Sequence, residues 1–79
     1  MKLVITVVGK DQVGIIAKVS NILADNGVNI LDISQTILQD KFTMMMYVEM
    51  DTQKINISDL KKAFEPMEQD MKLAIQIYA

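Results

Sequence analysis

Four apolar runs and two amphipathic stretches alternate along the chain. The first run, residues 3–8, is apolar or β-branched at every position, as expected for a central strand covered by helices on one face and by a partner on the other. The runs at 29–39 and 42–50 alternate apolar and polar residues, and Asp40-Lys41 between them indicates a two-residue hairpin turn. Residues 72–78 alternate in the same way and predict a last strand.

A first helix is predicted from about Gln12 to Asp25, with Asn26-Gly27 as a left-handed stop. Its apolar residues recur at helical spacing and form one stripe that we expect to be buried: Ile15, Ile16, Val19, Ile22 and Leu23.

A second helix is predicted after Asn56, which is a favourable N-cap. Ile55 and Leu60 stand at the positions of a hydrophobic staple. Pro66 lacks a backbone donor and disfavours helical geometry at Glu65, so the helix should end or kink there. The inward stripe is expected to consist of Leu60, Ala63, Phe64 and Met67.

A two-residue turn at Asp40-Lys41 also fixes which residues of the hairpin face each other. One face pairs Ile37 with Met44, Ile33 with Val48 and Leu31 with Met50, and we expect this apolar face in the core. The other face pairs Thr36 with Met45, Ser34 with Tyr47 and Asp32 with Glu49. Alternation sends Met44 and Met46 inward and Met45 outward, so the methionine run is interpreted as core filling rather than a soft-metal site.

The order strand, helix, strand, strand, helix, strand corresponds to two split βαβ units. It predicts an α+β fold, the ferredoxin-like βαββαβ sandwich, with a four-stranded antiparallel sheet and two helices on one face. At 79 residues the chain is one domain, residues 1–79. A chain of this size buries only about 60% of its unfolded surface, so we expect self-association to a homodimer or a higher oligomer.

Several side chains that carry chemistry are missing. The sequence has no histidine and no cysteine, and all eight basic residues are lysines. We therefore expect no metal, no cofactor and no enzyme activity, and Asp32 and Glu49 are poor candidates for a catalytic pair. A net charge of −2 disfavours nucleic acid as a partner. The lack of cysteine favours a cytoplasmic setting, and no apolar run approaches the roughly 18 residues that a membrane span needs.

The turn between the first strand and the first helix is the best candidate for a binding site. Gly9 and Gly14 bracket it, and a helix that begins there directs unpaired N–H groups toward a carboxylate or phosphate. If Asn29 begins a strand beside that turn, its amide completes a small pocket. The alternative is that the two glycines merely permit a tight turn and close packing.

The chain resembles the ACT domain, a small regulatory module that binds amino acids in many metabolic enzymes. The resemblance covers essentially all 79 residues and is greatest to stand-alone ACT proteins of bacteria and archaea. It is carried by Gly9-Lys10-Asp11-Gln12-Val13-Gly14-Ile15, Gly27-Val28-Asn29-Ile30 and Asp32-Ile33-Ser34-Gln35. In the family the turn commonly reads Asp-Arg-Pro-Gly, whereas this chain has Asp11-Gln12-Val13-Gly14 and leaves ligand capture to backbone N–H groups and Asn29.

The resemblance implies effector contacts at six positions: Asp11, Gln12, Val13, Gly14, Asn29 and Ile30. Gly14 would let the ligand approach the backbone, Asn29 would offer a donor and an acceptor, and Ile30 would touch the ligand side chain. In ACT dimers this pocket often lies at the interface. Two functions are left open: a homodimer that binds an amino acid and regulates a separate metabolic enzyme, or a ligand-free interaction module that docks on a partner enzyme.

Overall fold

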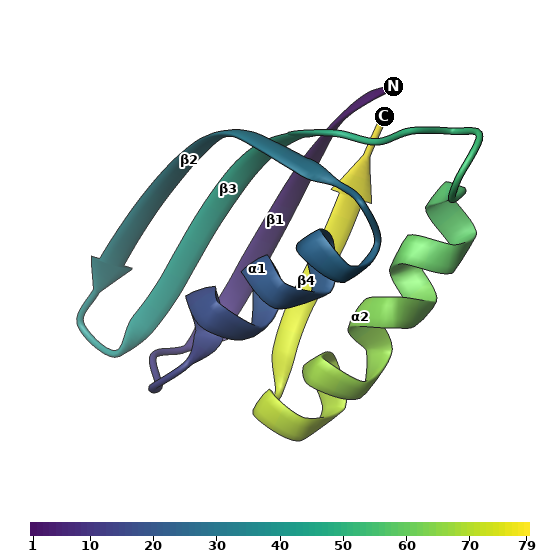
Figure 1. Ribbon diagram of the computed structural model, residues 1–79. Helices are drawn as coiled ribbons and strands as arrows, with labels where there is room; N and C mark the ends of the chain where they lie inside the picture. The colour runs from purple at the N-terminus through teal and green to yellow at the C-terminus, as the bar shows by residue number, and fades with distance from the viewer.

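The computed structural model describes all residues, 1–79. Its elements follow the predicted order: β1 (Lys2–Lys10), α1 (Ile15–Asp25), β2 (Asn29–Leu38), β3 (Lys41–Glu49), α2 (Ile57–Met71) and β4 (Leu73–Tyr78). The strands form one antiparallel sheet in the order β2-β3-β1-β4, and both helices lie on one face of it (Figure 1). The predicted ferredoxin-like fold is confirmed.

The core lies between the helices and the sheet, and every buried residue is apolar. The alternation of β3 is confirmed, because Met44 and Met46 are buried whereas Met45 is 55% exposed on the open face. Strand β2 contributes little to the core, since Ile30 is its only residue that packs against the buried cluster.

The start of α1 differs from the prediction, whereas its end agrees. The helix begins at Ile15 rather than Gln12, because Gly14 takes a left-handed φ of 94° and ends the turn. Ile16 is 40% exposed, so the predicted buried stripe is too wide by one residue at this end. The Gly27 stop is confirmed by its φ of 70°.

The start of α2 is confirmed in detail. Asn56 Oδ1 accepts a hydrogen bond from the Asp59 N–H at 2.8 Å, and Ile55 and Leu60 are both buried.

Of the two outcomes predicted at Pro66, an end of α2 there is wrong, because the helix continues to Met71. Phe64 before the proline and Met67 after it are both buried. Tertiary packing on both sides thus outweighs the loss of one backbone donor. Neither helix is long and apolar enough to cross a membrane.

The β2–β3 hairpin turns one residue earlier than predicted. Leu38 pairs with Lys41, so Gln39 and Asp40 form the turn, and Gln39 takes a left-handed φ of 55°. The predicted partners are wrong by two residues along β3. A shift of two residues nevertheless leaves the two faces of each strand unchanged.

A β-bulge at Leu31 changes the pairing at the start of β2. It lies between Ile30 and Asp32, so Asp32 faces Tyr47. The predicted pair of carboxylates, Asp32 with Glu49, is therefore not formed.

The predicted burial of the apolar residues of β2 is wrong. Leu31, Ile33 and Ile37 are 41%, 41% and 50% exposed, because β2 lies outside the area that α1 and α2 cover (Figure 1). Alternation predicts which face a side chain is on, but it does not predict how far the helices extend over that face.

The two edges of the sheet are protected to different degrees. On β4, which has six residues, the Ile75 N–H donates to Glu68 Oε2 at 3.1 Å, so a side chain of α2 covers part of that edge. On β2, which has ten residues, the Ile33 N–H donates to the exposed neighbour Asp32 at 2.9 Å, and no side chain accepts from the backbone further along. The β2 edge is thus the longer and the more open of the two.

Candidate functional site

The turn between β1 and α1 is tied to two other parts of the domain. The Asp11 N–H donates to the Asp40 carbonyl at 2.8 Å, which joins the turn to the β2–β3 hairpin. Gln12 Nε2 donates to the Met71 carbonyl at 2.9 Å and to the Lys10 carbonyl at 3.2 Å. The Asp11–Asp40 bond thus holds the turn against the hairpin, and the Gln12–Met71 bond holds it against the end of α2.

The N-terminus of α1 presents unpaired donors beside this turn. The N–H groups of Ile15, Ile16 and Ala17 have no acceptor, no side chain caps the helix and no acidic residue stands in its first turn. At Gly14 an added Cβ would meet nothing within 4 Å, so the space over the backbone is open. The donors and the helix dipole together favour an anionic group such as a carboxylate.

A shallow pocket of about 270 Å³ lies beside these donors. It is lined by Asp11, Gln12, Gly14, Ile15, Ile16, Ala17, Gln35 and Phe42. Three of the six predicted site residues therefore come together here. Val13 does not line the pocket, and its side chain is 98% exposed.

Five lining residues were not among the predicted contacts: Ile15, Ile16, Ala17, Gln35 and Phe42. Gln35 of β2 pairs with Met44 of β3, which is two residues from the partner that the predicted register gave it. Ile16 was predicted to be buried in the core. No signal in the sequence identifies Gln35 or Ile16 as pocket residues, because their exposure depends on how far the helices extend over the sheet, which is a property of the tertiary arrangement.

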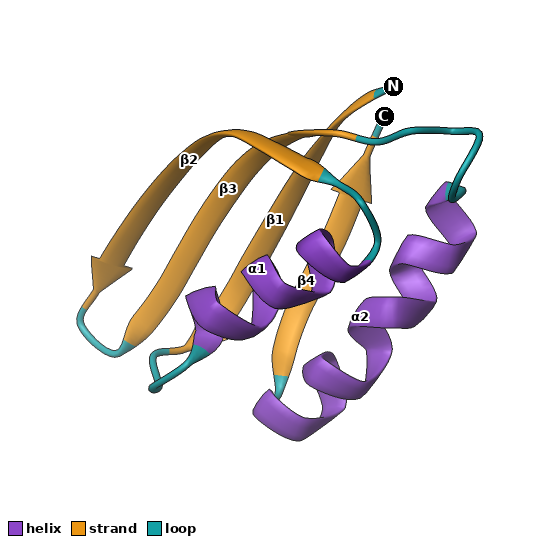
Figure 2. Cartoon of the chain, viewed as in Figure 1, coloured by secondary structure: helices purple, strands orange, loops and turns teal.

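The other two predicted residues, Asn29 and Ile30, lie at the opposite end of the sheet. They pair with Glu49 and Val48, level with the start of β1, whereas the turn follows the end of β1 (Figure 2). Strands β1 and β2 run in the same direction because both are antiparallel to β3, so about 30 Å of strand separates the two groups. Within one chain, the prediction that Asn29 stands beside the turn is wrong.

The sequence comparisons point to one family. The family model for the ACT domain matches residues 1–78. A UPF0237 protein of Clostridium acetobutylicum is 48% identical over 77 residues, which cover 98% of this chain and 84% of the relative. A UPF0237 protein of Methanocaldococcus jannaschii is 39% identical over 74 residues, which cover 94% of this chain and 82% of the relative.

Two solved structures are also similar to this chain. An ACT domain protein from Streptococcus pneumoniae superposes with a TM-score of 0.83 at 48% identity, covering 98% of this chain and 86% of that chain. The ligand-free regulatory subunit of aspartate kinase from Thermus thermophilus superposes with a TM-score of 0.76 at 26% identity, covering 96% of this chain and 49% of that chain.

Proposed function

The chain belongs to the ACT domain family, among the UPF0237 proteins of bacteria and archaea, and from this premise we propose that it is a homodimeric amino-acid sensor. In this proposal residues 1–79 act as one ACT domain in the cytoplasm. They bind an amino acid at the β1–α1 turn and regulate a separate metabolic enzyme, without catalysing a reaction themselves. The similarity to a regulatory subunit of aspartate kinase supports the regulatory role.

The observation that carries the proposal is the position of the two parts of the expected site along the open edge strand β2. The β1–α1 turn lies beside the hairpin end of β2, and Asn29 lies at its start. A twofold axis through the middle of β2 would pair this strand with its copy in an antiparallel ladder. The start of one β2 then lies beside the end of the other. Asn29 of one chain would thus approach the hairpin end of its partner, where the Asp11–Asp40 hydrogen bond holds the turn.

The exposed apolar side chains of β2 support its use as the dimer edge. Leu31, Ile33 and Ile37 are each at least 41% exposed, and a long apolar edge strand tends to pair with another chain unless it is covered. Glu68 occupies part of the alternative edge, on β4. Pairing through β2 would use the edge beside the part of the helix-side face that α1 and α2 leave bare.

Each part of the composite site has a chemical role in this proposal. The free N–H groups of α1 would receive the α-carboxylate of the ligand. The amide of Asn29 of the partner and that of Gln35 would bond the remaining polar groups, since each amide has both a donor and an acceptor. Ile16, which is exposed in the single chain, would contact the ligand side chain.

A thermal-shift screen against the standard amino acids tests the proposed function. A ligand at 100 times its dissociation constant stabilises the folded state by about 2.7 kcal/mol, which raises the melting temperature of so small a domain by about 10 °C or more. Sedimentation with and without the best ligand then reports whether binding favours the dimer. If no amino acid shifts the melting temperature, the protein is not an amino-acid sensor.

Two substitutions at Gly14 provide a matched pair for calorimetric titration. Gly14→Asp sets a carboxylate against the carboxylate of the ligand, whereas Gly14→Asn has nearly the same shape without the charge. Both replace a glycine with a φ of 94°, and Asn and Asp tolerate this region better than most residues. We expect Gly14→Asp to lose binding and Gly14→Asn to retain much more of it. Equal affinities in two folded variants would contradict a carboxylate site at this turn.

The second candidate function is a ligand-free interaction module that docks on a partner enzyme. It is favoured by the shallowness of the pocket and by the 98% exposure of Val13, which is an apolar side chain at the tip of the turn. The same screen separates the two functions, because only the sensor is stabilised by an amino acid.

A further inference from the structure

The face of the sheet opposite the helices has an apolar centre. Residues that pair directly across strands share a face, so the register assigns this face residue by residue. Its exposed apolar side chains are Val8, Met45, Tyr47 and Tyr78, each between 43% and 55% exposed, and Leu38, which pairs with Lys41 at the hairpin end and is 70% exposed. A contiguous apolar surface of this kind, flanked by polar residues, marks an interaction site.

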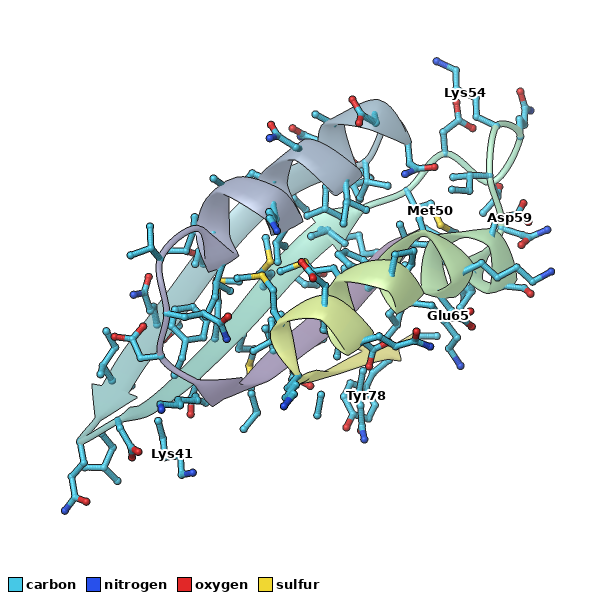
Figure 3. The ribbon with its side chains drawn as sticks, turned by 90° about the horizontal axis from the view of Figure 1, so that it is seen from below. Lys41, Met50, Lys54, Asp59, Glu65 and Tyr78 are labelled. Carbon is cyan, nitrogen blue, oxygen red and sulfur yellow. The ribbon has the colours of Figure 1, made fainter.

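The two ends of this open face carry different charges. At the hairpin end Lys10 and Lys41 lie directly opposite each other, and Lys41 follows the Gln39-Asp40 turn and lies near this end of the molecule (Figure 3). At the other end Lys2 lies opposite Glu49, and Asp32 lies one strand further out. The N-terminal ammonium of Met1 also lies at this end, where it donates to the Met50 carbonyl at 2.9 Å. The hairpin end of the face therefore has two cations, whereas the charges at the other end balance.

We propose that this open face stacks on the open face of a second copy of the chain, with the strands of the two sheets antiparallel. Lys41 and Glu49 are equally far from Met45 along β3, one on each side. A twofold axis that crosses the strands at Met45 therefore places Lys41 of each chain over the partner's Glu49.

Charge selects the antiparallel arrangement over the parallel one. A parallel stack would bring Lys10 and Lys41 of both chains together, so four cations would be crowded at one end. The antiparallel stack also brings Lys2 near the partner's Lys10, but Glu49 and Asp32 stand at the same corner and offset that repulsion. Asp11 and Asp40 lie in the turns beyond the strands, so their carboxylates are not counted among the charges of the stacked face.

The centre of the face has room for a side chain of the partner. A hollow of about 230 Å³ lies beside Val4, Met45 and Tyr47. In the antiparallel stack the partner's Met45 stands over this hollow, and a flexible thioether side chain suits an irregular apolar gap. Two sheets packed in this way lie about 10 Å apart, which side chains of this length fill.

The area of the face indicates how many chains take part. A four-stranded sheet with strands of six to ten residues presents roughly 500 Å², whereas a stable interface buries about 800 Å² per partner. Two chains joined through β2, as in the proposed function, double the area. The stack should therefore join two such dimers into a closed tetramer.

Sedimentation velocity of Met45→Glu tests the stack. The substitution places two carboxylates against each other at the twofold axis, so the tetramer should dissociate to dimers at concentrations where the wild type remains assembled. Gln69→Glu, at an exposed position of α2, adds the same charge elsewhere and should sediment like the wild type. If Met45→Glu and the wild type sediment alike at every concentration, the stack does not exist.

A charge reversal tests the orientation and does not depend on Met45. Lys41→Glu and Glu49→Lys should each weaken the tetramer, and the double variant should restore it, because both opposed pairs are then attractive again. Failure of the double variant to recover would overturn the antiparallel arrangement. Amino-acid binding is a separate readout, since Met45→Glu dimers should still bind the ligand found by thermal shift. Loss of the tetramer and loss of binding are thus distinguishable results.

Discussion

At the scale of single residues, Gln12 positions the turn by bonding to the protein rather than to a ligand. Its Nε2 donates to the carbonyls of Met71 and Lys10, so it links the end of α2 to the end of β1. The family resemblance indicated that this position matters, but it could not predict the partners of the side chain. The Met71 carbonyl is 59 residues away in the sequence and comes within reach only in the folded domain.

Gln12→Ala should destabilise the domain and loosen the turn. Two hydrogen bonds are lost, which corresponds to about 1–2 kcal/mol for partly exposed groups. We expect faster amide hydrogen exchange in residues 11–14 and a lower melting temperature. Gln69→Ala, which removes an exposed glutamine without a hydrogen bond, is the control. Identical exchange in the two variants would mean that Gln12 does not hold the turn.

Phe64→Ala tests the assignment of the inward side of α2. Phe64 is 1% exposed, so its truncation should lower the free energy of unfolding by about 3–5 kcal/mol in chemical denaturation. Lys61→Ala, on the exposed side of the same helix, should change it by less than about 0.5 kcal/mol. Equal losses would contradict the packing of α2.

At the scale of elements, the sequence predicts the order and type of each strand and helix, but it does not predict how far the helices extend across the sheet. The hydrophobic period identified β3 and both helices, and the caps at Asn56 and Gly27 are as expected. The hairpin turn was misplaced because Gln39 adopts a positive φ, which local sequence rules reserve mainly for Gly, Asn and Asp. The helix does not end at Pro66, because buried neighbours stabilise it on both sides of the proline.

Glu68→Ala tests whether α2 protects the β4 edge. The Ile75 N–H would lose its acceptor, so its hydrogen exchange should become faster. An unprotected second edge also allows open-ended pairing, so we expect larger particles in light scattering at high protein concentration. Glu65→Ala, nearby on α2 and without a bond to β4, is the matched control. If Glu65→Ala and Glu68→Ala behave alike, the hydrogen bond has no protective role.

At the scale of the whole molecule, the proposed function makes the dimer part of the binding chemistry. The turn at Gly14 and the strand start at Asn29 lie at opposite ends of one sheet, and only a second chain can bring them together. A ligand between them would bind the dimer and not the monomer, so amino-acid concentration would control assembly. The sequence suggested the residues of the proposed site, whereas the proposal that two chains form it follows only from the strand directions.

The central claim is that each site contains the turn of one chain and Asn29 of its partner. The most direct test mixes two variants that are each expected to bind no ligand, Gly14→Asp and Asn29→Asp. A mixed dimer has one site with both substitutions and one site with neither. After unfolding and joint refolding, calorimetric titration should therefore recover about one quarter of the wild-type number of sites at wild-type affinity. If the mixture binds no more ligand than the separate variants, the site does not lie between chains.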